Sequence, residues 1–318
     1  MGSDAGDLSG AERTGGSSPQ ALPAAGFVLL AGLTLFWGLN WPFMKIALGE
    51  IPVWIFRTLC LWVGGCGLLL LARLGGQRIL LRPAEIAPVA LCSVFNIVGW
   101  HLFSGYGLTL MEAGRASIIA FTMPVWASVL AVPVLGEAFT ARKALGLALG
   151  MASLVLLIGP DLAVLESAPL GALCMLGAAL TWATGTVLFK RFRWHSSTSS
   201  LVGWQLIAGA LPITAGMLIM NEPFEIAAVS PLAWGSTLYV LAFPMLFCQW
   251  AYFRTVRMFP ASLAAIGTLA IPILGVFSGA LVLGEAVGWR EALSLLAVCS
   301  ALAVVLVRPN AAPLVRDS

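Results

Sequence analysis

The sequence has very little charge. Only 10% of its 318 residues are Asp, Glu, Lys or Arg, while 60% are hydrophobic and the mean hydropathy is +0.97. Soluble domains average about 25% charged residues, so a water-soluble fold of this length could not hide so much apolar surface. The chain is therefore expected to lie in a lipid bilayer, which serves as its solvent and as a binding partner. The net charge of +3, without a basic run interleaved with aromatics, argues against nucleic acid.

Groups that do chemistry are scarce as well. The chain has two histidines and six cysteines, and no cysteine shows metal-ligand spacing. The cysteines lie in apolar stretches, which favours small buried hydrophobes over disulfides. No carboxylate falls at the middle of an apolar stretch. These absences argue against a membrane-embedded enzyme, which needs a nucleophile–base pair or a metal cluster, and no metal or cofactor is expected.

Apolar stretches of about 20 residues, long enough to span a bilayer, follow one another along the chain. Short breaks rich in Gly and Pro separate them. In lipid each stretch must be helical, because a strand would leave its backbone hydrogen bonds unmade. The predicted fold is an all-α integral membrane protein with ten transmembrane helices, at 25–48, 52–72, 84–109, 113–135, 141–159, 168–190, 198–220, 232–255, 261–283 and 288–308.

The distribution of basic residues predicts the orientation. Residues 1–24, rich in Gly and Ser, and residues 309–318 are expected to be cytoplasmic tails, the first of them disordered. This arrangement leaves most of the 17 Lys and Arg residues on the inner side, as the positive-inside rule requires. The four that fall on the outer side are Lys45, Arg57, Arg115 and Arg290.

One stretch of the sequence occurs twice: residues 113–145 align without a gap on residues 261–293. At equal spacing the copies carry a proline, then Leu-Gly-Glu-Ala, then an arginine: Pro124, Glu137 and Arg142 in the first, Pro272, Glu285 and Arg290 in the second. The chain therefore divides into two halves, 25–160 and 168–308. Each half holds an odd number of spans, so the second must cross the membrane in the opposite sense, as in secondary transporters with inverted repeats.

These motifs resemble the drug/metabolite transporter superfamily, in its ten-helix branch with two EamA-type domains. The segment LFWGLNWPFMK at 35–45 is similar to that family's first helix, and LTWATGTVLFK at 180–190 is its weaker copy. Within the family the chain looks most similar to the bacterial aromatic amino-acid and methyl viologen exporters. The resemblance implies a carrier of the bacterial inner membrane that exports small metabolites, above all amino acids, by alternating access.

Two other functions stay open as alternatives. A multidrug or lipophilic-cation exporter of the same fold would use an aromatic pocket for cation–π contact, although no central acid balances the charge. A channel is a further class, against which the hydrophobic mid-spans and the absence of charged rings count. Without a central acid, transport is expected to be facilitative, or weakly proton-coupled through His101.

The first apolar stretch carries a stripe of aromatic and polar residues. Trp37, Asn40 and Trp41 share one helical face, and a mid-span stripe of this kind is expected to line the substrate pathway. Pro42 frees the carbonyl of Gly38, which is expected to bond a ligand or water. The alternative is packing, with Asn40 satisfied by a neighbouring helix.

The third stretch and the second half supply the other candidate substrate-binding residues. Their shared property is an aromatic or polar side chain near mid-span, or at a position that the repeat relates to one. They are Asn96, Trp100, His101, Tyr106, Trp182 as the counterpart of Trp37, Gln249 as the counterpart of His101, and Tyr252 on the face of Gln249. The alternative is that each polar member is a hydrogen-bonded core residue.

The paired prolines Pro124 and Pro272 are candidate hinges, because a mid-helix proline removes a hydrogen bond and permits bending. Proline is also simply common in membrane helices. Thr122, two residues before the first proline, either contacts substrate or bonds back to its own helix. Gly146 and Gly150 have the spacing of close helix packing, within the chain or in a homodimer.

Four charged residues lie at helix ends. Glu137 and Glu285 each follow a glycine, which favours a capping or loop-bracing role over a role in transport. Lys45 and Arg57 flank the first outer break. The expected role of these two is snorkelling to the lipid headgroups. The alternative is attraction of a substrate carboxylate.

Overall fold

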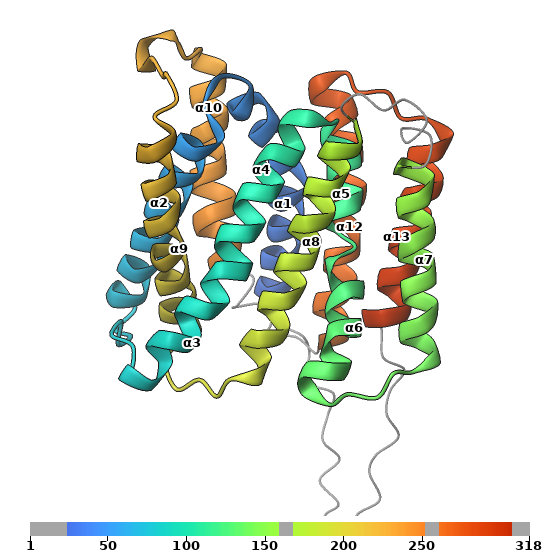
Figure 1. Ribbon diagram of the computed structural model, residues 1–318, viewed down its shortest axis with the longest axis horizontal. Helices are drawn as coiled ribbons and strands as arrows, with labels where there is room; N and C mark the ends of the chain where they lie inside the picture. The colour runs from blue at the N-terminus through green and yellow to red at the C-terminus, as the bar shows by residue number, and fades with distance from the viewer. Residues whose placement is uncertain (1–23, 159–167, 252–260, 307–318) are drawn as a thin grey trace, which may run out of the picture.

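The computed structural model describes residues 24–158, 168–251 and 261–306, which form a bundle of helices (Figure 1). Within these ranges no residue is in a β-strand, which confirms the prediction of an all-α protein. The elements are α1 (Ala24–Glu50), α2 (Val53–Leu74), α3 (Pro83–Ser93), η1 (Val94–Gly99), α4 (Trp100–Leu110), α5 (Ala113–Ala120), α6 (Met123–Leu135), α7 (Ala141–Ile158), α8 (Ala168–Arg191), α9 (Thr198–Met220), η3 (Ile226–Ala228), α10 (Pro231–Val240), η4 (Leu241–Cys248), α12 (Ala261–Leu283) and α13 (Trp289–Leu306).

Several helices are long and apolar enough to cross a membrane. The residues that the structure describes include six of them, where elements that follow one another without a gap count as one helix. They are Val53–Leu74, Pro83–Leu110, Ala113–Leu135, Leu170–Arg191, Thr198–Met220 and Pro231–Ala251. Their outward faces carry large apolar side chains such as Leu74, Leu173, Leu218 and Leu238. A surface of this kind needs lipid rather than water around it. The protein is a multi-pass membrane protein.

Consecutive helical segments run back and forth across the bundle. In Figure 1 the loops after α2, α6 and α8 lie at the lower end, and those after α1, α4 and α9 lie at the upper end. The lower loops and the helix ends beside them carry Arg78, Arg82, Lys143, Lys190 and Arg193. The two ends of the bundle therefore differ in charge.

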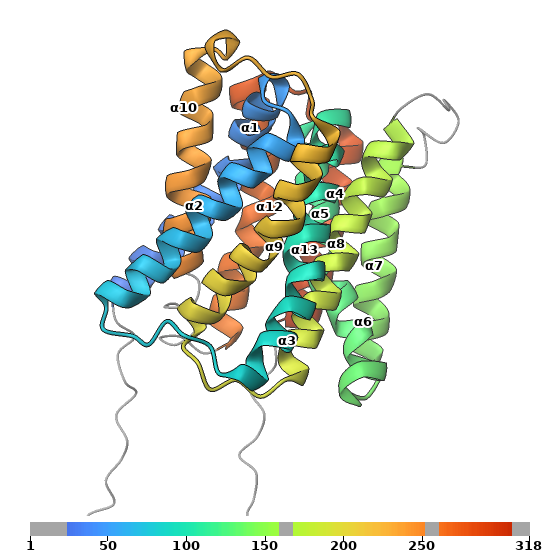
Figure 2. The same ribbon diagram turned by 60° about the vertical axis from the view of Figure 1, so that its left-hand side comes forward.

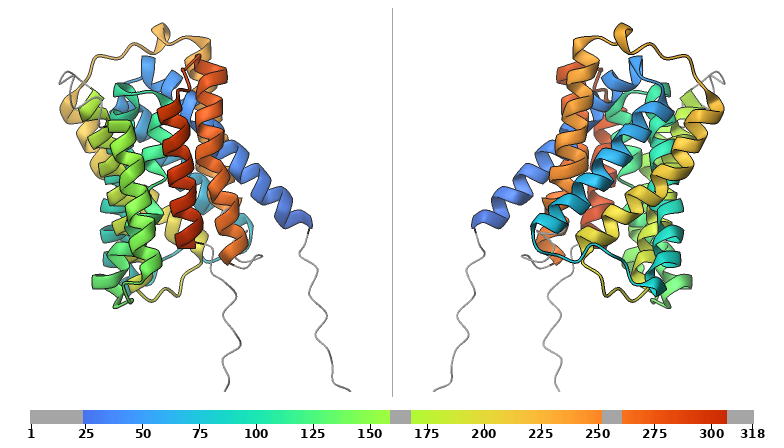
Figure 3. Two further views of the ribbon diagram at one scale, coloured as in Figure 1. Left: turned by 90° about the vertical axis from the view of Figure 1, so that its right-hand side faces the viewer. Right: turned by 90° about the vertical axis from the view of Figure 1, so that its left-hand side faces the viewer.

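Helices from distant parts of the sequence pack in pairs. The principal contacts are α2 with α9, α7 with α13, α1 with α12 and α10, and α8 with α4 and α6. Figure 2 shows α2 and α9 side by side, and Figure 3 shows α7 and α13 together beside α12. Small residues permit the closest approach: a Cβ on Gly65 of α2 would lie 3.1 Å from the carbonyl oxygen of Gly203 on α9.

Serines join α7 to α13. The Ser153 hydroxyl donates to the Ser294 carbonyl at 3.1 Å, and the Ser294 hydroxyl donates to the Ser153 carbonyl at 3.3 Å. One turn earlier on α7, a Cβ at Gly150 would be in ordinary contact with Val125 of α6. The Gly-rich face of α7 therefore serves packing within the chain.

Three predicted helices differ in detail from the expectation. The stretch 113–135, expected as one helix, is divided by a turn at Phe121 and Thr122 between α5 and α6. The physical reason is Pro124, which has no N–H to donate to the carbonyl of Ala120 one turn earlier, so the hydrogen-bond ladder of one continuous helix is interrupted there. The stretch 84–109 is continuous but contains the π-helix η1, and the segment 231–251 contains the π-helix η4.

Candidate functional site

Two of the predicted tryptophans meet inside the bundle. The rings of Trp100 on α4 and Trp182 on α8 have centroids 5.0 Å apart and are tilted by 60°. Gly99 makes the contact possible, because a Cβ there would lie 2.7 Å from the Thr181 side chain on α8. Both indoles are half-buried. They form an aromatic surface between the two halves of the chain.

His101 follows Trp100 on α4 and is only 5% exposed. Its Nδ1 atom has no hydrogen-bond partner among the described residues. Ser104, one turn further along the same helix, is fully buried. An unsatisfied buried nitrogen costs free energy, so a hydrogen-bond partner from outside the described residues would stabilise His101.

Arg57 of α2 lies at the same place in the bundle. Its Nη2 donates a 2.9 Å hydrogen bond to the Ser104 hydroxyl, and its Nε has no partner among the described residues. Only 2% of the residue is exposed, and its guanidinium carbon lies 5.5 Å from the centre of the Phe56 ring. The prediction that Arg57 snorkels to the headgroups is wrong. Arg57 starts one turn inside α2 and points inward, where Gly105 leaves room beside it.

Lys45 does not snorkel either, because it pairs with Glu285. Its Nζ lies 3.0 Å from the Glu285 Oε1, and the carboxylate also accepts hydrogen bonds from the backbone N–H groups of Ala113 at 2.7 Å and Gly114 at 2.9 Å. Glu285 thus caps the start of α5, as expected from its position after Gly284. This contact joins α1, α5 and the end of α12, and we refer to Lys45, Glu285 and the first N–H groups of α5 as the outer brace.

The three candidate residues on one face of α1, Trp37, Asn40 and Trp41, differ in how deeply they are buried. Trp41 is 3% exposed and packs at Gly275 of α12, so it is a packing residue in this conformation. Trp37 and Asn40 are half-buried, and the Asn40 Oδ1 has no partner among the described residues. The Ser278 hydroxyl of α12 lies 3.3 Å from the Gly38 carbonyl and 3.1 Å from the Gly275 carbonyl of its own helix, so the carbonyl expected to bond a ligand or water has a protein donor nearby in this conformation.

Asn96 contacts α9 and α8. Its amide donates a 3.4 Å hydrogen bond to the Gln205 Oε1, and a Cβ at Gly185 of α8 would collide with its side chain. Ser93 donates to the Gln205 carbonyl at 2.7 Å. Gln205 is a buried polar residue that the sequence analysis did not single out, since it stands alone among apolar residues.

The remaining candidates are spread more widely. Thr122 is buried, donates to the Ile119 carbonyl at 2.7 Å and accepts from the Trp126 indole at 3.1 Å, so both hydroxyl functions are used within its own segment. A substrate contact of Thr122 is therefore not seen. Tyr106 is 37% exposed, Gln249 is half-buried just after η4, and Tyr252 lies outside the described residues.

The arrangement described so far has known counterparts. The sequence profile of the EamA-like transporter family matches residues 24–159 and again residues 169–307. The chain belongs to the EamA-like transporter family. It is therefore a transporter and not a member of an enzyme family.

The relatives are distant but cover nearly the whole chain. The uncharacterized transporter YoaV of Bacillus subtilis is 27% identical over 278 residues, which are 85% of this chain and 92% of that protein. A probable amino-acid metabolite efflux pump of Salmonella typhimurium is 26% identical over 294 residues, which are 82% of this chain and 87% of that protein. A solved crystal structure with 20% identity superposes with a TM-score of 0.63 and covers 88% of this chain, so it shares the fold.

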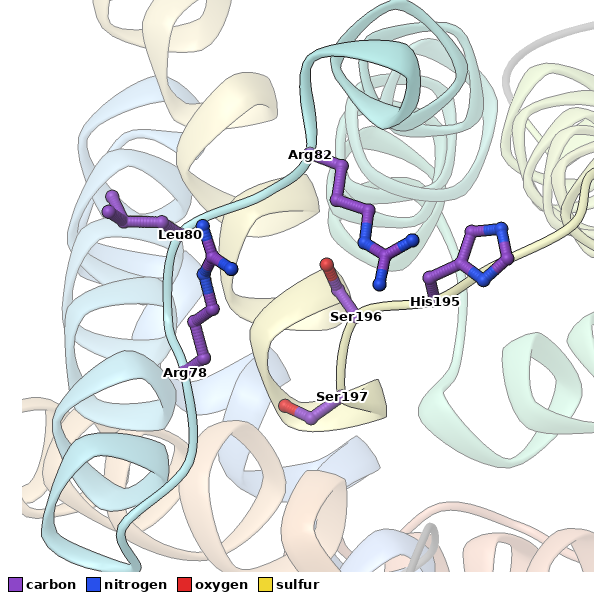
Figure 4. Close-up of a pocket in the computed structure, with 6 residues that line it drawn as sticks. All are labelled: Arg78, Leu80, Arg82, His195, Ser196 and Ser197. Atoms are coloured by element: carbon purple, nitrogen blue, oxygen red, sulfur yellow. The ribbon is translucent and has the colours of Figure 1, made fainter.

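A pocket opens at the lower end of this EamA-family protein. Figure 4 shows its lining by Arg78, Leu80, Arg82, His195, Ser196 and Ser197, from the loops after α2 and α8. Below it, Glu85 accepts hydrogen bonds from the backbone N–H groups of His195 at 2.6 Å and Ser196 at 3.1 Å. Glu85 thus fastens the α8–α9 loop to the start of α3, and the pocket is basic. No group of three His, Cys, Asp or Glu residues that could hold a metal occurs in the described part of the chain.

Proposed function

We propose that this protein exports amino acids, including aromatic and neutral ones, across a bacterial inner membrane by alternating access. The observation that carries the proposal is the contact of Trp100 with Trp182 beside the buried His101 and Arg57. An aromatic surface next to hydrogen-bonding groups suits an amphipathic metabolite. Two relatives named as probable amino-acid metabolite efflux pumps, 26% and 25% identical, point to the same substrate class.

The proposal includes ten spans arranged as two inverted five-helix repeats, residues 25–160 and 168–308. The helix contacts support it, because they occur in exchanged pairs. The contacts of α1 with α12 and α10 have counterparts in those of α8 with α5, α6 and α4, whereas α2 with α9 and α7 with α13 are each their own counterpart. The π-helices η1 and η4 precede His101 and Gln249. Gly136 and Gly284, which end α6 and α12, share a φ of 70°.

Both termini are proposed to be cytoplasmic. The basic residues at the lower end of the bundle in Figure 1 support this orientation, because Lys and Arg are enriched in cytoplasmic loops. The upper end, with the outer brace, would then face the periplasm. Movement between inward-open and outward-open states is proposed to use Pro124, beside the break between α5 and α6, and Pro272 in α12 as hinges.

An exporter of lipophilic cations is the second candidate, because the Trp100–Trp182 surface also suits a cation. Arg57 disfavours it: a cation would approach a buried guanidinium that has no described carboxylate partner. The two substrates therefore make opposite electrostatic demands on the same region.

Counterflow in proteoliposomes tests the proposed function. Vesicles loaded with a panel of unlabelled amino acids, cationic drugs and nucleosides are assayed for uptake of labelled phenylalanine. We expect saturable exchange with neutral and aromatic amino acids, and a loss of about tenfold in Trp182→Ala, as one aromatic contact is worth about 1 kcal/mol. Trp250→Ala, an exposed residue outside the cluster, is the matched control. Absence of phenylalanine uptake, together with exchange of a labelled cationic drug in the same vesicles, would overturn the amino-acid assignment in favour of the second candidate.

A further inference from the structure

Arg57 is a buried cation without a buried anion. Of the cations near the upper end, Lys45 pairs with Glu285 at 3.0 Å and Arg115 pairs with Glu291 at 2.8 Å. Arg290 lies 5.3 Å from the centre of the Trp289 ring, close to the surface. Arg57 is more deeply buried than any of these, and its one described side-chain hydrogen bond goes to a neutral hydroxyl. Desolvating a guanidinium costs several kcal/mol unless an anion compensates it.

We propose that Arg57 is an anion subsite that binds the carboxylate of the transported substrate, a statement that rests on the proposed function for the identity of that substrate. Carboxylate is favoured over other anions because the guanidinium fork matches its two oxygens. Ser104 takes one N–H of Nη2, and Nε has no acceptor. A carboxylate accepting from Nε and an adjacent N–H would make the paired bonds that the described residues do not supply.

The acids of the upper end do not supply this partner in the conformation described. Glu285 is occupied by Lys45 and the first N–H groups of α5. Glu291 accepts from Arg115 and from the backbone of Gly288 at 2.9 Å. Because these carboxylates are held by other groups, the anion that matches Arg57 is expected to come from outside the chain.

The rest of the substrate would extend along α4. Trp100 and Ser104 are one turn apart on one face of that helix, separated by about 6 Å along its axis. That distance is comparable to the length of an aromatic amino acid. A substrate whose carboxylate meets Arg57 beside Ser104 therefore brings its side chain toward the Trp100–Trp182 surface. His101 lies between these two places in the sequence, one turn before Ser104.

Matched acids and amides separate this subsite from the proposed function. The affinity of the purified protein is measured for each of four ligands: phenylalanine, phenylalaninamide, phenylacetate and phenylacetamide. For the native protein we expect each acid to bind at least about tenfold more tightly than its amide, since a bond to a charged group contributes about 1.5–3 kcal/mol. In Arg57→Gln this preference is expected to fall below about twofold. Arg290→Gln, another cation of the upper end, is the control and should keep the native preference.

Each outcome decides a different question. An unchanged acid-over-amide preference in a folded Arg57→Gln protein overturns the subsite, and so does an equal weakening of acids and amides. If Arg57→Gln fails to fold, Arg57→Lys and the native acid–amide pairs decide: a native protein that binds acids and amides alike contradicts the proposal. If phenylacetate binds in an Arg57-dependent manner while no amino acid exchanges in proteoliposomes, the subsite stands and the amino-acid function fails. If amino acids exchange but acids bind no more tightly than amides, the amino-acid function stands and the Arg57 subsite fails.

Discussion

Buried polar side chains fall into two groups in this protein. Most are satisfied within the bundle: Ser117 donates to the Gly114 carbonyl at 2.7 Å, and Ser278 donates to Gly38. A second group retains a buried atom without a partner among the described residues: Asn40, Trp54, Arg57, Thr58, Gln77, Asn96, His101 and Ser236. Of these, His101 and Arg57 lie together beside Ser104. Hydrogen bonding in the interior of a membrane protein is normally complete, so unsatisfied atoms mark places where function overrides stability.

His101 is the first residue to test. We expect His101→Ala to lower the initial rate of exchange by about tenfold or more, because removal of a polar contact to the substrate costs about 1–3 kcal/mol. Insertion into the membrane should stay normal, since the imidazole Nδ1 makes no described hydrogen bond whose loss would harm folding. The measurement is counterflow, normalised to the amount of folded protein. His195→Ala, in the loop after α8, is the control, and equal rates in both variants would make His101 a packing residue.

At this scale the sequence identified residue types better than residue roles. It placed Trp100 and Trp182 on the candidate pathway, and the structure brings them into contact. It also placed Trp41 and Thr122 there, although the first packs against α12 and the second bonds within its own segment. For Arg57 it favoured snorkelling. Helical periodicity defines the face of a residue but not the neighbour of that face, which depends on long-range packing.

At the scale of helices, the outer brace joins three hydrogen bonds at one carboxylate, that of Glu285. A carboxylate at a helix start is favourable because it meets unsatisfied N–H groups and the positive end of the helix dipole. Glu285 is 9% exposed at its side chain, and it connects three helices that belong to different parts of the sequence. The brace therefore ties α1, α5 and the end of α12 together in the conformation described.

Removal of the Glu285 charge tests this role. We expect Glu285→Gln to lower the free energy of unfolding by about 2 kcal/mol, because it weakens a charged pair and two charge-assisted bonds at α5. The measurement is the midpoint of thermal unfolding in detergent. Glu225→Gln, an exposed acid at the same end, is the matched control. A midpoint shift no larger than in the control would contradict the brace.

The helix positions were well predicted, but their irregularities were not. The stretch predicted at 198–220 is α9, Thr198–Met220, because Pro and Gly breaks and hydropathy mark its ends. The π-helices η1 and η4 have no such signal, since hydropathy does not distinguish one helical hydrogen-bond pattern from another. The break before α6 follows from Pro124, which the sequence did mark as a hinge.

Pro124 permits a test of movement separate from binding. In Pro124→Ala the missing N–H is restored, so α5 and α6 are expected to join into one stiffer helix. We expect exchange to slow by about tenfold, while the affinity for substrate changes by less than about twofold. Pro133→Ala, in the same helix but exposed, is the control for a general effect of proline removal. Equal exchange rates in Pro124→Ala and the native protein would contradict the role of Pro124 as a hinge.

At the scale of the whole molecule, charge placement bears on the energy source of transport. The acids of the described helices lie in terminal turns: Glu50 ends α1, Glu85 starts α3 and Glu291 starts α13. Proton-driven carriers need a titrating group within the membrane that alternates between the two sides. Between the ends of the described helices His101 is the histidine placed to do so, and Arg57 bonds Ser104 one turn further along α4, so a proton on His101 would be a second positive charge near a buried cation.

Facilitative transport follows as the expected mechanism. Counterflow of labelled phenylalanine should proceed at equal pH on both sides, and an imposed gradient of about one pH unit should change its rate by less than about twofold. A carrier that couples one proton to each substrate would instead accumulate the substrate about tenfold for each pH unit of the gradient, because one pH unit is worth about 1.4 kcal/mol per proton. A protonophore distinguishes the two, since it abolishes only the coupled accumulation. Strict dependence on the gradient in the native protein, lost in His101→Gln, would refute facilitation and make His101 the proton carrier.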